Sequence, residues 1–386
     1  MRKTPALFHL ALCLLPLLPT LACSEPDEAS SASSASGGAG GGAGVGGNGG
    51  AGGGAGGSGG AGGGDPAPPK TRIALGSCMH QDKKKPVLNL ATASAPDLFV
   101  FLGDNIYGDS TDLAVLQAKY DKLAASPEFQ ALRAAVPLIA TWDDHDYGAN
   151  DAGKEYPQKA ATKGLFLDFW EEPAGSPRRT QEGIYTSYLY EEPGGTVQVI
   201  LLDTRWFRDP LDLNSDPTKY KNDYQPTMDT SRTMLGDAQW AWLEGELGKP
   251  ADVRILGTST QFGHEYNGYE SWTNMPHERQ KMVDLIKKTG AEAAIFISGD
   301  VHWGELSKLE AAGGYPLYDL TSSGITETWP AIEVNANRVG EPVAENNYGF
   351  VEVTWGETDH AISLGLVDVA GVTRVQHEVS TSDLRF

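Results

Sequence analysis

Short apolar runs that each end in polar residues recur along the chain from Thr71 onward, and this pattern limits the folds open to it. Unbroken apolar runs of this length are typical of strands that are buried on both faces of a sheet. A strand with one face in water would instead alternate apolar and polar residues. The runs occupy residues 72–76, 98–102, 136–141, 197–202, 253–256 and 293–297.

Stretches with apolar residues at helical spacing lie between several of these runs. Asp237 and Pro276 stand near the starts of two such stretches, where helices commonly begin. Strands that alternate with helices predict an α/β domain built in layers. The tail, residues 349–378, alternates apolar and polar residues and predicts antiparallel strands that complete a sheet. The helical stretches occupy residues 113–124, 128–135, 237–247 and 278–288.

The N-terminus has the features of an export signal. Arg2 and Lys3 precede an apolar run, residues 6–21, which is too short and too interrupted by proline to span a membrane comfortably. The run leads into Cys23 in a context that resembles a bacterial lipoprotein processing site. We therefore expect residues 1–22 to be a signal peptide and Cys23 to carry a lipid anchor that holds the protein at a membrane of the cell envelope. Plain secretion, into the periplasm or beyond, is the alternative.

Residues 24–64 are rich in serine and alanine and then almost pure in glycine and alanine. Such a stretch has little to bury and cannot offset the entropy of ordering its backbone, so it predicts a flexible tether. We expect the lipidated Cys23 and its tether to occupy residues 23–70, and one folded domain to occupy residues 71–386. Within that domain Cys78 is the only cysteine, so no internal disulfide is expected.

The chain is acidic, with a formal net charge of −21 at pH 7. Negative charge repels the phosphate backbone, so nucleic acid is not expected as a partner. An excess of carboxylates suits cation binding, although most surface carboxylates in any protein are simply solvated. Charge does not decide the oligomeric state, for which a monomer is the simplest expectation.

Reactive and metal-binding side chains follow the predicted strands directly. Ligands of α/β sheets bind where the carboxyl ends of strands converge, so these residues are candidates for a site. Carboxylates gathered there would repel one another and could not all ionise without cations. A Gly-Asp-x-x-Tyr segment alone is more often a turn, but the conjunction of such motifs at successive strand ends predicts a metal site. The candidates are Cys78, Asp104, Tyr107, Asp143, Asp144, His145, Asp146, Arg205, Gln261, Asp300 and His302.

The candidate ligands divide by their chemistry. Thiolate, phenolate and imidazole suit a transition metal, which points to Cys78, Tyr107 and His302. Carboxylate and amide oxygens suit calcium or magnesium, which points to the aspartates and Asn105. A phenolate favours a highly charged ion such as ferric iron, because the metal must displace a proton whose pKa is about 10.

The order of these motifs resembles that of the PhoD-type alkaline phosphatases, which belong to the calcineurin-like metallophosphoesterases. The resemblance extends over roughly residues 72–324. It implies a four-layer α/β/β/α sandwich around a centre of ferric iron with one or two calcium ions, or with other divalent metals. The main motifs lie at residues 76–78, 103–107, 142–146 and 298–302, and secondary markers lie at residues 203–205, 235–243 and 272–279.

By position, the resemblance implies an iron site and a calcium site that share Asp104 as a bridge. The iron (Fe3+) ligands that it implies are Cys78, Asp104, Tyr107 and His302. The calcium (Ca2+) ligands that it implies are Asp144 and Asp300, with Asp143 as their neighbour. Asn150 and Asp151 are candidates to extend the calcium shell. Some members of the family carry a small β domain before the first motif, where this chain has its glycine-rich tether.

These features predict hydrolysis of phosphate esters outside the cytoplasm by a metal-bound hydroxide. Arg205 is a candidate clamp for the phosphate, or else the ion-pair partner of a nearby acid such as Asp203. His145 is a candidate to protonate or orient the leaving group, or else a histidine that supports a carboxylate. An aromatic loop either rims the pocket or, as is commoner, packs in the core; its members are Tyr266, Tyr269 and Trp272.

Two other functions fit the same residues. A phosphodiesterase or phospholipase that acts on teichoic-acid-like polymers or phospholipids would use the same metal centre. A surface lipoprotein that binds calcium without catalysis is the second alternative, although it would not need Cys78, Tyr107 and His302. A serine hydrolase is excluded, because no Gly-x-Ser-x-Gly segment follows any of the predicted strands.

Overall fold

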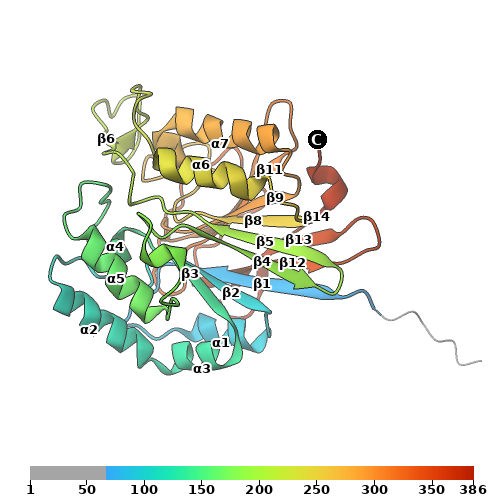
Figure 1. The fold of residues 1–386 in the computed structure, drawn as a ribbon, viewed down its shortest axis with the longest axis horizontal. Helices are drawn as coiled ribbons and strands as arrows, with labels where there is room; N and C mark the ends of the chain where they lie inside the picture. The colour runs from blue at the N-terminus through green and yellow to red at the C-terminus, as the bar shows by residue number, and fades with distance from the viewer. Residues whose placement is uncertain (1–66) are drawn as a thin grey trace, which may run out of the picture. The chain divides into compact units, whose positions relative to one another are not determined.

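The computed structural model describes residues 67–386, in which two six-stranded sheets lie face to face between helices (Figure 1). The strand order is β14-β13-β12-β1-β2-β3 in the first sheet and β10-β11-β9-β8-β5-β4 in the second. The first sheet consists of β1 (Lys70–Gly76), β2 (Leu98–Leu102), β3 (Leu138–Thr141), β12 (Asn347–Thr354), β13 (Ala361–Asp368) and β14 (Thr373–Ser380). The second consists of β4 (Thr186–Glu192), β5 (Gly195–Leu201), β8 (Val253–Gly257), β9 (Ala294–Ser298), β10 (Gly304–Leu309) and β11 (Leu317–Ser322).

Helices cover the outer faces of the sheets (Figure 1). One apolar cluster lies between the outer face of the first sheet and the helices that cover it. A second apolar cluster fills the space between the two sheets and extends under the helices of the second sheet. The helices over the first sheet are α1 (Pro86–Ala93), α2 (Leu113–Ala124), α3 (Pro127–Ala135), α4 (Asp144–Tyr147) and α5 (Lys159–Phe169). Those over the second sheet are α6 (Gly236–Leu247) and α7 (Pro276–Thr289).

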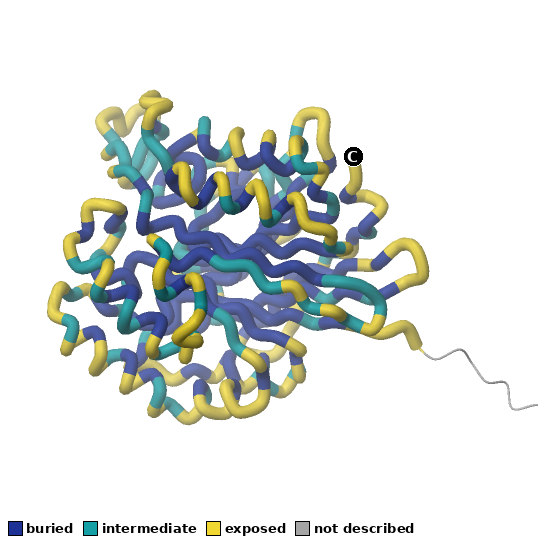
Figure 2. Tube along the Cα trace, viewed as in Figure 1, coloured by how far each residue is buried: buried dark blue, intermediate teal, exposed yellow. Residues whose placement is uncertain are grey.

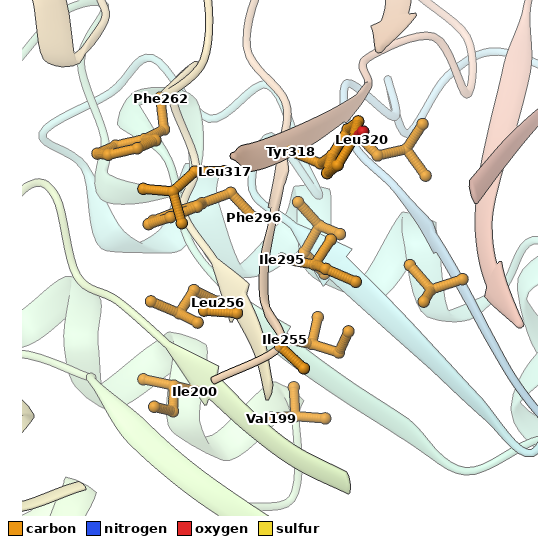
Figure 3. Close-up of a cluster of buried hydrophobic side chains, with 14 of the residues drawn as sticks. Val199, Ile200, Ile255, Leu256, Phe262, Ile295, Phe296, Leu317, Tyr318 and Leu320 are labelled. Atoms are coloured by element: carbon orange, nitrogen blue, oxygen red, sulfur yellow. The ribbon is translucent and has the colours of Figure 1, made fainter. Parts of the chain in front are cut away.

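The inner strands bury both of their faces, as their unbroken apolar runs predict. In β2, Val100 and Leu102 face the core between the sheets, whereas Phe101 packs under the helices of the first sheet. Paired residues of β5, β8 and β9 alternate in the same way (Figure 3). Figure 2 shows these strands buried along most of their length, with the exposed positions on helix surfaces and in loops. In Figure 3, one face of the sheet carries Val199, Ile255 and Ile295. The opposite face carries Ile200, Leu256 and Phe296.

The four-layer α/β/β/α sandwich expected from the sequence is confirmed. The predicted strands and helices form with ends shifted by no more than two residues, and the predicted antiparallel strands of the tail are β12, β13 and β14. The structure adds α1, α4, α5, β4, β10 and β11, which the sequence pattern did not predict. It also adds a small hairpin of β6 (Asp212–Leu213) and β7 (Tyr224–Gln225) outside the two sheets.

The predicted signal peptide and the lipid attachment at Cys23 lie outside the described residues, as does most of the tether. Among residues 67–386, no helix combines the length and the apolar character that crossing a bilayer requires.

Candidate metal centre

Loops at the carboxyl ends of β1, β2, β3 and β9 bring the predicted site residues together. Cys78 follows β1, Asp104 follows β2 and His302 follows β9, and one candidate ligand atom from each lies within 4.8 Å of the others. A second group with the same spacing consists of Asp143, Asp144 and Asp300. The polar residues that were distant in sequence therefore meet at one edge of the two sheets.

Asp104 and Asp144 connect these groups into one cluster. A carboxylate oxygen of each lies within 4.8 Å of a ring nitrogen of His145, and Asp144 is equally close to Asp151 and Glu270. Asp144 thus belongs to three of the candidate groups and Asp104 to two. Carboxylates shared in this way allow a site to hold more than one ion, with a bridging ligand between the ions.

Tyr107 lies beside the first group of ligands. Its hydroxyl oxygen is 3.1 Å from Nε2 of His302. The thiol of Cys78 donates a weak hydrogen bond to Oδ2 of Asp104 over 3.4 Å. Sulfur, phenol, imidazole and carboxylate are therefore neighbours here, and this mixture of donors suits a transition metal better than calcium alone.

Several of these residues have left-handed backbone conformations. The angle φ is 58° at Cys78, 49° at Asp104, 74° at Asp300 and 63° at His302. A residue other than glycine adopts this conformation at a cost of about 1–3 kcal/mol, and such strain gathers at functional sites. The surrounding structure holds it in place; for example, the backbone N–H of His302 donates to Oγ of Ser323 over 2.7 Å.

A pocket of about 260 Å³ opens onto the cluster. Cys78 and Asp143 are fully buried and do not line the pocket. The pocket combines carboxylates, histidines and aromatic rings, and its size suits a small ligand. It is lined by Asp104, Asp144, His145, Asn150, Asp151, Asp223, Tyr224, Tyr269, Glu270, Asp300, Val301, His302 and Trp329.

Burial strongly disfavours negative charge in the cluster. It raises the pKa of the Cys78 thiol to about 12 and the pKa of the Asp143 carboxyl to about 7. It also raises the pKa values of Asp104 and Asp300 well above their usual range, with repulsion from neighbouring acids adding to the shifts. At neutral pH these groups release their protons fully only where cations replace them. Burial lowers the pKa of His302 to about 4, so its imidazole is neutral, as a metal ligand must be.

Buried oxygens at the cluster lack hydrogen-bond partners within residues 67–386. A buried acceptor without a partner is costly, and a bound cation removes that cost. These oxygens are Oδ1 of Asp104, Oδ1 of Asn105, Oδ2 of Asp143 and Oδ1 of Asp144. Both the free oxygens and the chemistry of the neighbouring donors therefore fit a metal cluster.

Arg205 lies behind the cluster and does not line the pocket. Its side chain is 0% exposed, its Nε donates to Oδ1 of Asp143 over 2.5 Å, and its Nη1 is 2.6 Å from Oε2 of Glu270. Asp203, the partner suggested from the sequence, instead accepts a hydrogen bond from the backbone N–H of Arg205 over 2.9 Å. The geometry favours the structural ion pair over the phosphate clamp for Arg205. Its partners are Asp143 and Glu270 and not Asp203, which the sequence suggested.

His145 forms part of the pocket wall. Its Nδ1 is 2.6 Å from Oδ1 of Asp109, and its ring centroid is 4.2 Å from that of Tyr107. Burial alone would lower the pKa of His145, but the negative charges of Asp144 and Asp109 outweigh burial and raise the pKa to about 9. These charges favour the protonated imidazole, which is the form that has a proton to donate, as long as no cation lies beside the ring.

The aromatic loop divides between the pocket and the core. Tyr269 lines the pocket, whereas Trp272 is buried and donates from Nε1 to Oγ1 of Thr258 over 2.9 Å. Tyr266 lines a separate cleft. Core packing is thus the correct interpretation for Trp272, and a place on the pocket rim is correct for Tyr269.

Two strand-end candidates are structural. Asp146 accepts hydrogen bonds from the backbone N–H groups of Asn105 and Asp143, each over 3.1 Å. Gln261 donates from Nε2 to Oε1 of Glu305 over 2.7 Å, away from the pocket. By contrast, Asn150 and Asp151, the candidates for the calcium shell, both line the pocket.

Several pocket residues were not identified from the sequence. None of them follows a predicted strand, and each lies in a loop or in the small hairpin without a recognisable motif. The only signal was for Glu270, which directly follows Tyr269 of the aromatic loop. The missed residues are Asp223, Tyr224, Glu270 and Trp329.

Several solved structures have a similar fold, and PhoD and GAP50 are two of them. The structure of PhoD matches with a TM-score of 0.58 and 19% identity, over 81% of this chain and 73% of that chain. GAP50, the anchor in the inner membrane complex of Plasmodium, matches with a TM-score of 0.53 and 13% identity, over 82% of this chain and 90% of that chain. At these identities the likeness concerns the fold alone.

Comparison at the level of sequence is more specific. Alkaline phosphatase D of Bacillus subtilis (strain 168) is 26% identical over 269 residues, a match that covers 59% of this chain but only 44% of that protein. The family model described as PhoD-like phosphatase matches residues 74–344. That range includes every loop that supplies the candidate metal ligands, and the chain belongs to the PhoD-like phosphatase family.

Proposed function

We propose that this protein hydrolyses phosphate esters with the help of a bound metal cluster. The observation that carries the proposal is the convergence of Cys78, Asp104 and His302 within 4.8 Å of one another at the pocket. Free buried oxygens on the neighbouring aspartates support it, as does membership of the PhoD-like phosphatase family. A thiol and an imidazole beside carboxylates go beyond what structural calcium needs.

The ligand chemistry supports two kinds of ion. When bound, the ions would lower the pKa of a water molecule and offset the negative charge of the phosphate. The residues that would hold ferric iron are Cys78, Asp104, Tyr107 and His302. The residues that would hold one or two calcium ions are Asp143, Asp144 and Asp300.

His145 would supply the proton that the leaving group needs. Hydrolysis forms a bond between a water oxygen and phosphorus and breaks the bond between phosphorus and the alcohol oxygen. The alcohol oxygen would take a proton from His145, whose ring lies 2.6 Å from Oδ1 of Asp109, and the proton that the attacking water loses would return to the ring through solvent. The products are the free alcohol and inorganic phosphate.

The protein would act outside the cytoplasm, held at a membrane by a lipid on Cys23 or else secreted. The basic residues and short apolar run before Cys23 support this part of the proposal. In a bacterial host, we expect the full chain in the membrane fraction and the Cys23→Ser variant in the soluble exported fraction. The same distribution for both would contradict the anchor.

Elemental analysis and a substrate panel test the proposed activity. We expect the purified full chain to contain iron and calcium, to hydrolyse p-nitrophenyl phosphate or its bis-ester, and to lose activity after treatment with a chelator. Asp104→Asn and His302→Gln should each lower kcat/KM at least about a hundredfold. Glu357→Gln, an exposed change in the turn between β12 and β13, is the matched control and should retain activity.

The same experiment separates the alternatives. A clear preference for the bis-ester would favour a phosphodiesterase or phospholipase on the same centre. Calcium without iron, together with no hydrolysis, would favour a calcium-binding lipoprotein. Full activity in both Asp104→Asn and His302→Gln would contradict the proposed centre.

A further inference from the structure

The wall of the pocket contains no lysine or arginine among the residues that the structure describes. Bound ions would balance the acids of the cluster, but Asp223 lies in the pocket wall outside all of the candidate metal groups. Two aromatic side chains, Tyr269 and Trp329, line the same pocket. A carboxylate beside aromatic faces is a combination that binds organic cations.

Trp329 is held in place while part of its ring stays open to solvent. Its backbone N–H donates to the carbonyl oxygen of His302 over 2.9 Å, and its ring meets the His302 ring edge-on with centroids 4.7 Å apart. The side chain is nevertheless 39% exposed. The ring centroids of Tyr269 and Trp329 are 5.4 Å apart, and the two ring planes meet at an angle of 59°. The two rings therefore form an aromatic wall directly beside a proposed iron ligand.

Asp223 is fixed by its backbone and keeps its carboxylate free. The residue is exposed, and its carboxylate forms no hydrogen bond or ion pair with the rest of residues 67–386. Its N–H donates to the carbonyl oxygen of Gly268 over 2.9 Å. Lys221 does not neutralise it, because Nζ of that lysine is 2.9 Å from Oε2 of Glu333. Burial and the negative charges of Glu333 and Asp223 together raise the pKa of the Tyr269 phenol, which shows that Asp223 lies close enough to interact with this ring.

We propose that the preferred substrates are phosphate esters whose alcohol carries a positively charged nitrogen, which lies against Trp329 and Tyr269 beside Asp223. The inference rests on the proposed hydrolase function and names the substrate class. The phosphate faces the metal cluster, and the cationic nitrogen faces the aromatic wall. Hydrolysis transfers the hydroxyl of water to phosphorus and its proton to the oxygen of the amino alcohol, which leaves inorganic phosphate.

The same charges select against other alcohols. An alcohol with a carboxylate or a second phosphate would meet Asp223 with a like charge and without a compensating lysine or arginine in the wall. A neutral alcohol would gain contact with the rings but no attraction to the carboxylate. Selection by charge therefore distinguishes this proposal from simple selection for apolar alcohols.

The test compares phosphocholine with 3,3-dimethylbutyl phosphate, which has the same shape without the positive charge. For the full, metal-loaded chain we expect kcat/KM to be about tenfold higher for phosphocholine. In Trp329→Leu and in Asp223→Asn this ratio should fall towards one. Glu357→Gln makes the same change of charge at an exposed position in the β12–β13 turn and should keep the ratio of the unmodified chain. The ratio is measured within each variant, so a general loss of activity does not obscure it.

The outcomes separate this inference from the function on which it rests. Equal rates on the two esters, or a preference that survives in both pocket variants, would overturn the inference and leave the hydrolase function standing. If the metal-loaded chain hydrolysed neither these esters nor p-nitrophenyl phosphate, the proposed function would fail and the inference with it.

Discussion

Arg205 has a fully buried guanidinium that is paired with Asp143, a candidate metal ligand, and with Glu270. Removing one partner of a buried ion pair leaves the other charge without compensation, which typically costs about 3–5 kcal/mol. We expect Arg205→Met to lower the free energy of unfolding by that amount in urea denaturation. Arg133→Met, which breaks an exposed pair with Glu171, is the control and should cost no more than about 1 kcal/mol. Equal stability of the two variants, with weaker binding of phosphate only in Arg205→Met, would instead support the clamp.

His145 lines the pocket and is hydrogen-bonded to Asp109, as a proton donor to the leaving group should be. Protonation matters most for poor leaving groups, because an alkoxide is far more basic than p-nitrophenolate. His145→Gln should therefore lower kcat about 10²–10⁴-fold on an alkyl phosphate and much less on p-nitrophenyl phosphate. Asp109→Asn should show the same pattern in weaker form. A uniform loss on both esters would mean that His145 only supports its neighbours.

At the scale of elements, β2 and β9 could be predicted because a strand buried on both faces leaves an unbroken apolar run in the sequence. β11 could not, because its buried faces include Asp319, which accepts hydrogen bonds from the backbone N–H groups of Phe262 and Gly263 over 2.8 and 2.7 Å. Those contacts come from a loop distant in sequence. Helix α5 could not be predicted for another reason. It contains Gly164, which has a low helix propensity, and its first turn has no side-chain cap.

The candidate site likewise contains residues that could be predicted from the sequence and residues that could not. Cys78, Asp104 and His302 directly follow strands, so the topology alone brings them to one edge. Glu270 and Trp329 come from loops whose course depends on tertiary contacts, such as the hydrogen bond from the Trp329 N–H to the His302 carbonyl. Local sequence carries no signal of such contacts, so four of the thirteen residues that line the pocket appeared only in the structure.

The turn after β2 depends on Gly103. Its φ is +101°, and a Cβ at this position would lie 2.4 Å from Cβ of Asp143 and 2.7 Å from the backbone nitrogen of Asp143. We expect Gly103→Ala to cost about 2–4 kcal/mol and to weaken metal binding, because Asp104 and Asp143 must both move. Thermal unfolding and metal content would measure the two effects. Gly164→Ala within α5, where a Cβ meets nothing within 4 Å, should instead stabilise by about 0.5–1 kcal/mol.

For the whole molecule, metal binding and protonation compete. Without metal, burial raises the pKa values of Asp143 and Asp151 to about 7, so the folded protein binds more protons than the unfolded chain between about pH 4 and 7. The stability contributed by these groups therefore falls as pH rises through that window. Ions that replace the protons should stabilise the protein more at pH 8 than at pH 5.

The measurement is the difference in Tm between metal-loaded and chelator-treated protein at the two pH values. We expect a larger difference at pH 8. His264, whose pKa burial lowers to about 4, destabilises the fold as pH falls from about 6.5, which is the opposite trend. It is outside the candidate metal groups, so its effect cancels in the difference. A difference that is equal at both pH values, or larger at pH 5, would contradict the competition.

The pairing of β1 with β12 joins the first strand of the described residues to the C-terminal segment, with Lys70 opposite Thr354 and Leu75 opposite Gly349. During synthesis β1 therefore has β2 as its only partner until the final strands emerge. Contacts so distant along the chain make folding slow, and an unpaired strand edge invites association with other chains. The edge of β1 that β12 covers therefore stays open to association with other chains until the C-terminal segment has been synthesised.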